Sequence, residues 1–153
     1  MTEFLKKNTL KFRLAKMSDM PSIVSLVESA YRGKHSLNGW TTESEFIDGQ
    51  RTDEKEVSEL IQKDNSILLL CHDDSGLLAT LQLQKSGEKA YLGMFAVDPV
   101  KQGRGIGYAL LKQAEDYAID QWSCQKMRML VITIRTELID WYVRHGYQRS
   151  GIF

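Results

Sequence analysis

The chain has 153 residues, which is the size of a single domain, because one hydrophobic core usually serves roughly 100 to 200 residues. Hydrophobic residues make up 42% and charged residues 26%, with 11 glycines and 2 prolines. These values exclude collagen-like, low-complexity and largely disordered chains. Twenty Lys and Arg balance twenty Asp and Glu, so no overall charge favours a nucleic acid or a membrane surface as partner. We expect one domain over residues 1–153.

The cysteine content and the termini bear on metal sites and location. Cys71 and Cys124 are too few for a disulfide scaffold, and no Cys/His spacing suggests a zinc site. We expect two buried thiols, no metal and a reducing compartment. The N-terminus lacks the apolar stretch of a secretory signal, and the longest apolar run, residues 67–71, is far too short to span a membrane. The sequence therefore predicts a cytoplasmic protein.

The first third of the chain predicts a strand and a helix followed by a loop. Alternation over residues 11–16 favours a short edge strand. The next helix has Asp19 as its cap and Pro21 in its first turn, and it ends near Gly33. Its apolar residues recur at helical spacing: Ile23, Leu26, Val27 and Ala30. Residues 35–52 favour a loop around one short helix.

The middle of the chain predicts a helical piece and three antiparallel strands. The helical piece covers residues 55–62. The segments 67–72 and 77–84 are separated by DDSG, a strong turn sequence, so we expect a hairpin. A second turn leads into a strand over residues 91–97.

The last third predicts helices and strands in alternation. Residues 105–121 form the clearest helix, because their apolar positions fall on one face. A buried strand over 127–133 follows, then a helix over 137–145 that Gly146 ends, then a final strand over 147–153. The order β-α-α-β-β-β-α-β-α-β describes an α/β (α+β) domain with a mixed, mostly antiparallel central sheet flanked by helices.

The segment VDPVKQGRGIGY, residues 97–108, is the most informative. A strand ends there, and Gly103, Gly105 and Gly107 open a helix. Backbone N–H groups at a helix N-terminus, with no side chains in the way, form an anion site for a phosphate or pyrophosphate. A tight turn with close helix packing is the alternative explanation of the same glycines.

Two common phosphate-binding motifs do not fit this loop. A dinucleotide fingerprint GxGxxG would need glycine at position 108 or 110, which hold Tyr108 and Leu110. No GK[ST] closes the loop as a Walker motif requires. The sequence therefore disfavours a nucleotide-binding domain, although that interpretation stays as a third alternative.

QGRGIG, residues 102–107, instead resembles the QxxGxG acyl-CoA signature of the GNAT superfamily of N-acetyltransferases. YLGMFAVDP resembles the fourth strand of that family, and WYVRHGY, residues 141–147, resembles its late helix and following strand. The resemblance covers residues 91–153 and implies a GNAT-like fold with acetyl-CoA as cosubstrate.

The resemblance also implies which residues bind acetyl-CoA. The pyrophosphate would lie against the backbone N–H groups of Gln102, Gly103, Arg104, Gly105, Ile106, Gly107 and Tyr108. The pantetheine arm would pair with the backbone of Phe95, Ala96 and Val97, where the fourth and fifth strands of the family splay apart. Lys101, Arg104 and Arg135 are candidates for the other phosphate oxygens, and the sequence does not separate them.

Acyl transfer to an amine needs a base, a polarised carbonyl and a proton for the leaving thiolate. Tyr142 matches the tyrosine of the family that often supplies this proton, and a phenol with a pKa of about 10 is protonated at neutral pH. The alternative is that Tyr142 packs in the core or holds the cofactor sulfur. A backbone N–H near residues 95–97 would polarise the carbonyl.

The base stays unassigned, because residues 91–97 contain no acid; the remaining candidates are His35, Glu43 and Glu137, each also explained as an ordinary surface residue. His72 and His145 are interpreted as structural.

The acceptor pocket of the family corresponds to residues 30–52. Tyr31 and Trp40 are candidates for an aromatic wall, although Trp40 would equally well seal the core. Residues 43–59 contain seven acidic and two basic residues. This charge suits a cationic amine, but a solvated pair of helix faces explains it more simply and is the preferred interpretation.

The sequence thus supports two main hypotheses. The first is an enzyme that transfers an acetyl group from acetyl-CoA directly to a primary amine of a small molecule, with a homodimer expected only by family analogy. The second is an acyl-CoA-binding sensor or regulatory module that has lost catalysis.

Overall fold

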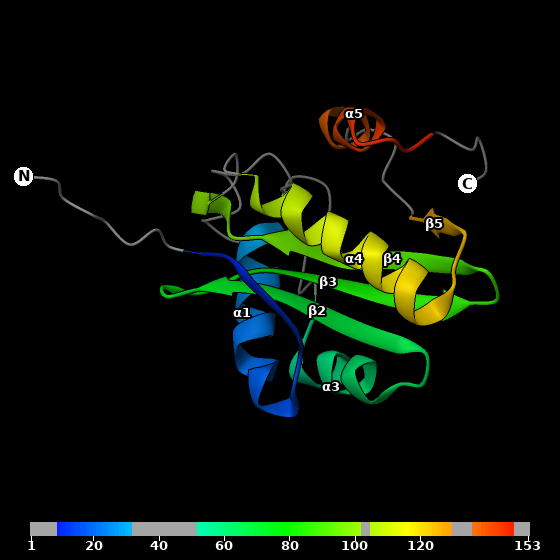
Figure 1. Ribbon diagram of the computed structural model, residues 1–153. Coiled ribbons are helices and arrows are strands. Elements are labelled where there is room, and N and C mark those ends of the chain that lie inside the picture. The colour runs from blue at the N-terminus through cyan, green and yellow to red at the C-terminus, as the bar shows by residue number, and fades with distance from the viewer. Residues whose placement is uncertain (1–8, 32–51, 102–104, 130–135, 149–153) are drawn as a thin grey trace, which may run out of the picture.

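The computed structural model describes residues 9–31, 52–101, 105–129 and 136–148 of the chain. Its elements follow the predicted alternation of strands and helices (Figure 1). In chain order they are β1 (Lys11–Leu14), the 3-10 helix η1 (Met17–Asp19), α1 (Met20–Tyr31), α3 (Glu54–Gln62), β2 (Ser66–Asp73), β3 (Gly76–Ser86), β4 (Lys89–Val97), the 3-10 helix η2 (Pro99–Lys101), α4 (Ile106–Trp122), β5 (Lys126–Arg128) and α5 (Thr136–Arg144).

The described strands form one sheet in the order β1-β2-β3-β4-β5. Neighbouring strands are antiparallel except β4 and β5, which are parallel. The predicted hairpin is confirmed, because β2 and β3 pair along their lengths and Asp73 lies opposite Gly76. Gly76 has a φ of 125°, a conformation that glycine adopts without a steric cost. The expected mixed, mostly antiparallel sheet is therefore present.

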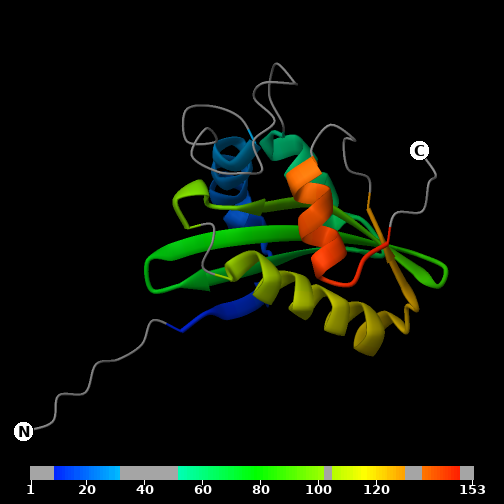
Figure 2. The ribbon, with the colours of Figure 1, turned by 90° about the horizontal axis from the view of Figure 1, so that it is seen from above.

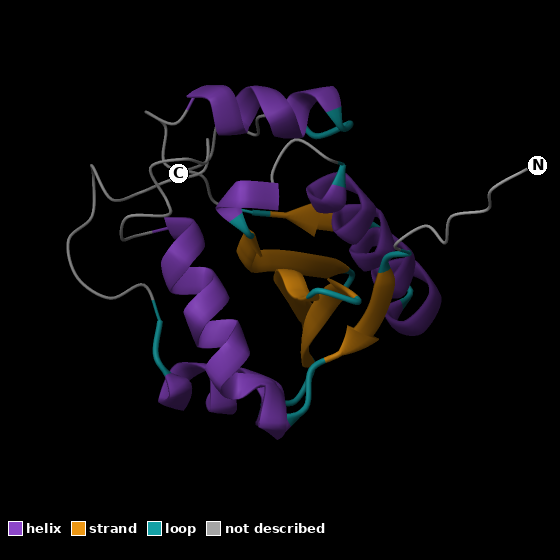
Figure 3. Ribbon diagram, turned by 90° about the vertical axis from the view of Figure 1, so that its left-hand side faces the viewer, coloured by secondary structure: helices purple, strands orange, loops and turns teal. Residues whose placement is uncertain are grey.

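Helices cover both faces of the sheet, as Figures 1 and 3 show. We call the face under α1 and α3 the α1 face, and the face under α4 and α5 the α4 face; Figure 2 looks onto the latter. Side chains alternate along a strand, so Leu68 and Leu70 of β2 lie in the core on the α1 face and Leu69 lies in the core on the α4 face. This two-sided burial explains the unbroken apolar run in β2.

The start of α1 differs from the expectation. Asp19 was predicted to cap this helix, but its carboxylate accepts hydrogen bonds from the Lys16 backbone N–H at 2.8 Å and from the Arg13 guanidinium at 2.7 and 2.8 Å. The reason is the short η1 turn before α1, which brings Asp19 back over Lys16. The bidentate ion pair lowers the pKa of Asp19 to about 2, chiefly through the Arg13 hydrogen bond.

The end of α5 agrees with the expectation. Gly146 has a φ of 96°, and its N–H donates to the Val143 carbonyl at 3.1 Å, while the Tyr147 N–H donates to the Tyr142 carbonyl at 3.1 Å. This pair of bonds is a Schellman motif, which needs a left-handed residue at the position of Gly146. The glycine therefore ends α5 and fixes the direction of the chain that follows.

Several other expectations are settled only in part. The predicted strand over 127–133 was expected to be buried, but β5 covers residues 126–128, and Met127 and Arg128 are half-buried. Residues 130–135, the loop over 32–51 and most of the final strand, residues 149–153, lie outside the described residues.

The structure also gives the state of the cysteines and allows a search of the described residues for metal-binding clusters and membrane-spanning helices. Cys71 and Cys124 are buried free thiols. Within the described ranges, no cluster of three or more His, Cys, Asp or Glu residues has a metal-binding arrangement. No helix there has the length and apolarity needed to cross a bilayer.

Candidate active site

The link between β4 and α4 is a short, hydrogen-bonded turn. The Asp98 N–H donates to the Leu78 carbonyl at 2.8 Å, which holds the end of β4 against β3. The Asp98 carboxylate accepts a hydrogen bond from the Val100 N–H at 3.1 Å, and the Asp98 backbone carbonyl accepts one from the Lys101 N–H at 2.8 Å. These bonds form η2 and set the point from which the glycine-rich segment begins.

The N-terminus of α4 has the backbone conformation that the glycine motif predicts. Gly105 is the cap residue of α4 with a φ of 78°, which strongly favours glycine. The first intrahelical bond runs from the Ala109 N–H to the Gly105 carbonyl at 3.0 Å. The N–H groups of Ile106, Gly107 and Tyr108 precede that bond and lie at the positive end of the helix dipole, the geometry that binds an anion.

The side chains of this first turn have different environments. Ile106 is 5% exposed and packs in the core of the α4 face, whereas Tyr108 is 48% exposed. A Cβ at Gly107 would lie 3.4 Å from Val97, 3.6 Å from Phe95 and 3.7 Å from Trp141. Gly107 thus faces β4 and α5 at ordinary contact distances.

Strand β4 has a bulge beside this helix. Thr80 pairs with Ala96 and Gln82 pairs with Gly93, so Leu81 faces two residues of β4, Met94 and Phe95. Met94 has a φ of 45°, an unusual conformation for a residue with a side chain. A bulge of this kind redirects the backbone and side chains that follow it, and here these are residues 95–97.

Strand β5 pairs with the start of β4. The described pairing with β5 covers three positions and ends where Tyr91 pairs with Arg128, since Met129 is no longer in a strand. The described pairing of β4 with β5 thus stops short of the β4 bulge.

Tyr142 lies in an aromatic cluster at this bulge. Its side chain is 7% exposed. Its ring lies 6.5 Å from the ring of Phe95 and 5.2 Å from the ring of Trp141, while Phe95 and Trp141 are 6.0 Å apart with an edge-to-face orientation. The bulge of β4 and the C-terminal half of α5 are thus joined by three rings in geometries that aromatic pairs favour.

A second group of rings connects α5 to the first turn of α4. His145 lies 4.2 Å from Trp141 and 4.8 Å from Tyr108, measured between ring centroids. Its Nδ1 lies 2.7 Å from the Trp141 carbonyl oxygen, so Nδ1 carries the proton and donates it. The expectation that His145 is structural agrees with these contacts. The spacing of Trp141 and His145 predicts that they share a helix face, but no local pattern predicts Tyr108 as their neighbour.

Tyr147 adds a polar contact that the sequence analysis did not predict. Its hydroxyl donates to Glu115 Oε2 at 2.8 Å, and its ring lies 5.7 Å from that of Tyr142. Burial, and then the neighbouring Glu115 carboxylate, raises the pKa of Tyr147 well above its usual value. The phenol is therefore the donor of this bond at neutral pH.

The structure describes only part of the predicted site. The described candidates where β4, α4 and α5 meet are Phe95, Val97, Gly105, Ile106, Gly107, Tyr108 and Tyr142, whereas the side chain of Ala96 packs in the core of the α1 face. Tyr31 is the last residue of α1, and its side chain is outside the described residues, as is that of Glu137 in α5. Other candidates also lie outside: Gln102, Gly103, Arg104, Arg135, Trp40, His35 and Glu43.

The described residues fit acetyl-CoA. The left-handed Gly105 and the first turn of α4 suit a pyrophosphate, and the bulged edge of β4 suits an extended arm. The aromatic cluster around Tyr142 suits an apolar, water-poor site for the thioester.

Comparisons with known proteins agree with this fit. The sequence model of the acetyltransferase (GNAT) family matches residues 34–147. A search of curated proteins found no match.

Solved structures show the same fold. Aminoglycoside N-acetyltransferase AAC(6')-Iy in complex with CoA has a TM-score of 0.75 at 11% identity, over 99% of this chain and 95% of that chain. The ribosomal-protein-S18-alanine N-acetyltransferase of Escherichia coli has a TM-score of 0.71 at 17% identity, over 93% of this chain and 79% of that chain. The ribosomal-protein-alanine N-acetyltransferase of Brucella melitensis has a TM-score of 0.70 at 14% identity, over 95% and 96%.

These likenesses are at low identity and support the fold alone, whereas the family match covers most of the sequence. The chain therefore belongs to the GNAT family of acetyltransferases and is an N-acetyltransferase that uses acetyl-CoA.

Proposed function

We propose that the enzyme transfers the acetyl group directly to a primary amine of a small molecule, and that Tyr142 donates a proton to the leaving thiolate. The amine nitrogen forms a bond to the thioester carbon, the carbon–sulfur bond breaks, the amine loses a proton and the sulfur gains one. Acetyl-CoA supplies the activated acyl group when it is bound. Residues of the chain carry out the remaining tasks of the reaction.

The observation that carries the proposal is the place of Tyr142. Its side chain is 7% exposed and lies against Phe95, directly after the β4 bulge. A buried phenol beside the strand where we expect the thioester supports Tyr142 as the proton donor, and the rings around it favour a site that is poor in water.

A second requirement of the reaction is that the thioester carbonyl is polarised. A thioester carbonyl is polarised by a fixed N–H donor, which needs no special side chain. The family resemblance implies that a backbone N–H of Phe95, Ala96 or Val97 polarises the carbonyl, and we propose the same role here.

The preference for a small amine rests on charge and on likeness to other enzymes. α3 presents three exposed carboxylates on the α1 side of the sheet, Glu54, Glu56 and Glu59, which attract a cationic amine before it is bound. Two of the similar structures are named as aminoglycoside acetyltransferases, and two as ribosomal-protein alanine acetyltransferases. Tyr31 and Trp40 remain the proposed aromatic wall of the acceptor pocket.

We place the enzyme in the cytoplasm, which suits the two free buried thiols, Cys71 and Cys124. A homodimer is part of the proposal by family analogy alone, and sedimentation of the purified chain tests it.

The test is CoA release from acetyl-CoA in the presence of amines, combined with calorimetric titration. The panel contains an aminoglycoside, an amino sugar, a diamine and a peptide with an N-terminal alanine. Turnover with a small amine and not with the peptide supports the proposal. Turnover with the peptide alone contradicts the small-molecule assignment, and saturable acetyl-CoA binding without any turnover favours the sensor or regulatory module.

A further inference from the structure

Three aromatic rings from α5 and α4 lie against one another in series. The ring centroids of Trp141 and His145 are 4.2 Å apart, and those of His145 and Tyr108 are 4.8 Å apart. The planes of the two pairs are inclined by 34° and 39°, so each ring covers part of the face of the next. We call Trp141, His145 and Tyr108 the ring stack. It connects the C-terminal half of α5 to the first turn of α4.

The ring stack is fixed at its inner end and exposed at its outer end. His145 Nδ1 lies 2.7 Å from the Trp141 carbonyl oxygen, a hydrogen bond that sets the orientation of the imidazole. Trp141 and His145 are half-buried, whereas Tyr108 is 48% exposed. The outermost ring therefore rests on a fixed partner and still presents surface to solvent.

Tyr108 also belongs to the turn that we expect to bind the pyrophosphate of acetyl-CoA. Its N–H follows those of Ile106 and Gly107 at the positive end of the α4 dipole. Side chains of a helix tilt towards its N-terminus, so the Tyr108 side chain leaves the backbone on the side of that anion site. In CoA, a single ribose separates the diphosphate from the adenine. A diphosphate at this turn therefore brings the adenine within reach of the Tyr108 ring.

The exposed ring suits a nucleic-acid base. Every base has a flat π face, and it stacks on an aromatic side chain without needing a particular set of hydrogen bonds. A ring that is already held in place loses less conformational freedom on binding than a free one. Tyr108 meets both conditions, because His145 supports it and its surface is open.

We propose that Tyr108 stacks on the adenine of acetyl-CoA, and that His145 is a positioning residue that holds the Tyr108 ring for this contact. The inference rests on the proposed place of the pyrophosphate at the start of α4. It does not depend on the acceptor or on the role of Tyr142. Part of the affinity for the cofactor then comes from its adenosine and not from the arm that carries the acetyl group.

Calorimetry on the full chain tests the stacking with three ligands: CoA, adenosine bisphosphate, which lacks the arm, and phosphopantetheine, which lacks the adenosine. Tyr108→Ala should weaken CoA binding about tenfold, as expected for one lost base–aromatic contact. It should weaken adenosine bisphosphate to the same degree and leave the phosphopantetheine Kd unchanged. Tyr108→Trp keeps an aromatic surface and should restore CoA binding. An unchanged CoA Kd in Tyr108→Ala overturns the inference, as does an equal loss for phosphopantetheine, which has no base to stack.

The positioning role of His145 has its own variants. His145→Ala should weaken CoA and adenosine bisphosphate and spare phosphopantetheine, because only the support of the Tyr108 ring is lost. His145→Phe retains a ring at that place and should recover most of the affinity. Equal Kd values for CoA in His145→Ala and the wild type would overturn this role.

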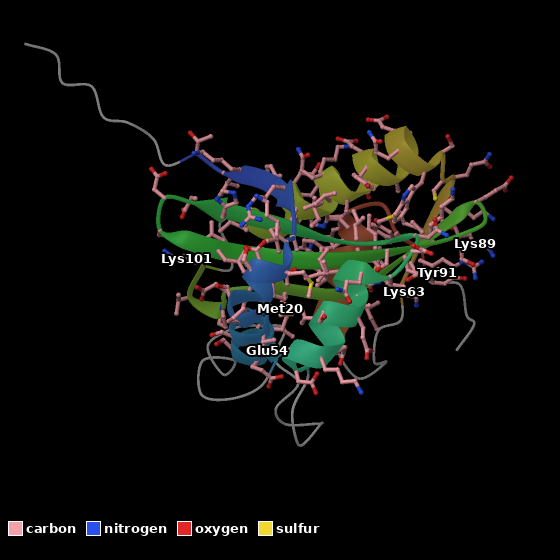
Figure 4. The ribbon with its side chains drawn as sticks, turned by 90° about the horizontal axis from the view of Figure 1, so that it is seen from below. Met20, Glu54, Lys63, Lys89, Tyr91 and Lys101 are labelled. Carbon is pink, nitrogen blue, oxygen red and sulfur yellow. The ribbon has the colours of Figure 1, made fainter. Side chains whose placement is uncertain are left out.

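The matched control is Tyr91→Ala. Tyr91 is 40% exposed, and it lies near the start of β4, whereas η2 and the glycine-rich segment follow the end of that strand. Figure 4 shows Tyr91 and Lys101, the last residue of η2, towards opposite ends of the sheet. This variant should bind all three ligands as the wild type does. A loss of CoA affinity equal to that of Tyr108→Ala would overturn the assignment to Tyr108.

NMR separates a failure of this inference from a failure of the pyrophosphate site on which it rests. The ring signals of Tyr108, assigned with Tyr108→Phe, should shift when adenosine bisphosphate is added. The backbone amides of Ile106 and Gly107 report the anion site and should shift with phosphopantetheine. Shifted amides with an unchanged Tyr108 ring overturn the stacking and leave the anion site intact. If CoA binds and none of these signals moves, the anion site is contradicted and the inference fails with it.

Discussion

The Tyr147 hydroxyl donates a 2.8 Å hydrogen bond to the Glu115 carboxylate, which joins the segment after α5 to the middle of α4. The Tyr147 ring also lies 5.7 Å from that of Tyr142. Because the Schellman motif at Gly146 fixes the path from α5 to Tyr147, this bond holds α5, and with it Tyr142, in place against α4.

Tyr147→Phe removes this bond and leaves the Glu115 carboxylate without its donor. We expect the free energy of unfolding to fall by about 1.5 to 3 kcal/mol, the usual contribution of a hydrogen bond to a charged group. Urea denaturation measures it. Tyr117→Phe is the matched control, since Tyr117 is also half-buried on α4 and contacts Trp122 through its ring. Equal stability of the two variants would show that the bond contributes nothing.

Gly105→Ala tests the conformation of the cradle. A Cβ there would meet nothing within 4 Å, but the φ of 78° is unfavourable for alanine, so we expect a loss of about 1 kcal/mol in stability and weaker acetyl-CoA binding by calorimetry. Gly107→Ala is the comparison, because its Cβ would make ordinary contacts at 3.4 Å or more. If Gly105→Ala bound acetyl-CoA as tightly as the wild type, the left-handed turn would not be part of the cofactor site.

Asp19→Asn tests the ion pair with Arg13. Pairing lowers the pKa of Asp19 from 3.8 to about 2, so its contribution to stability is complete above about pH 4 and is lost as the pH falls through 2. The wild type should therefore be more stable than Asp19→Asn at pH 7, and the difference should shrink at pH 3. Denaturant unfolding at both pH values measures it, with the exposed Asp120→Asn as control. A difference that grows at low pH would contradict this assignment.

Local sequence patterns predicted most of the elements. The DDSG turn, the periodic apolar residues of α4 and the glycine after α5 each depend on neighbours in sequence, and the structure has the hairpin, the helix and the Schellman motif at those places. The role of Asp19 was predicted wrongly, because Ser, Thr, Asp and Asn before a helix usually cap it, whereas here the short η1 turn presents a different N–H, that of Lys16.

Features that depend on tertiary contacts had no such signal. A positive φ at Met94 is not expected from a methionine, so the bulge that positions Phe95 was not predicted. The contact of Tyr108 with His145 joins two helices far apart in sequence. The contacts of Gln82 with Ser66 and Gly93 join side chains of three strands, so no local pattern predicted them.

The most direct test of the account is the rate of acetyl transfer by Tyr142→Phe at saturating acetyl-CoA and amine, with acetyl-CoA binding measured in parallel by calorimetry. Phenylalanine keeps the ring packed against Phe95 and Trp141 and removes only the proton donor. We predict a kcat lower by about 10² to 10⁴ with an unchanged acetyl-CoA Kd. An unchanged kcat would contradict the account and leave Tyr142 as a packing residue.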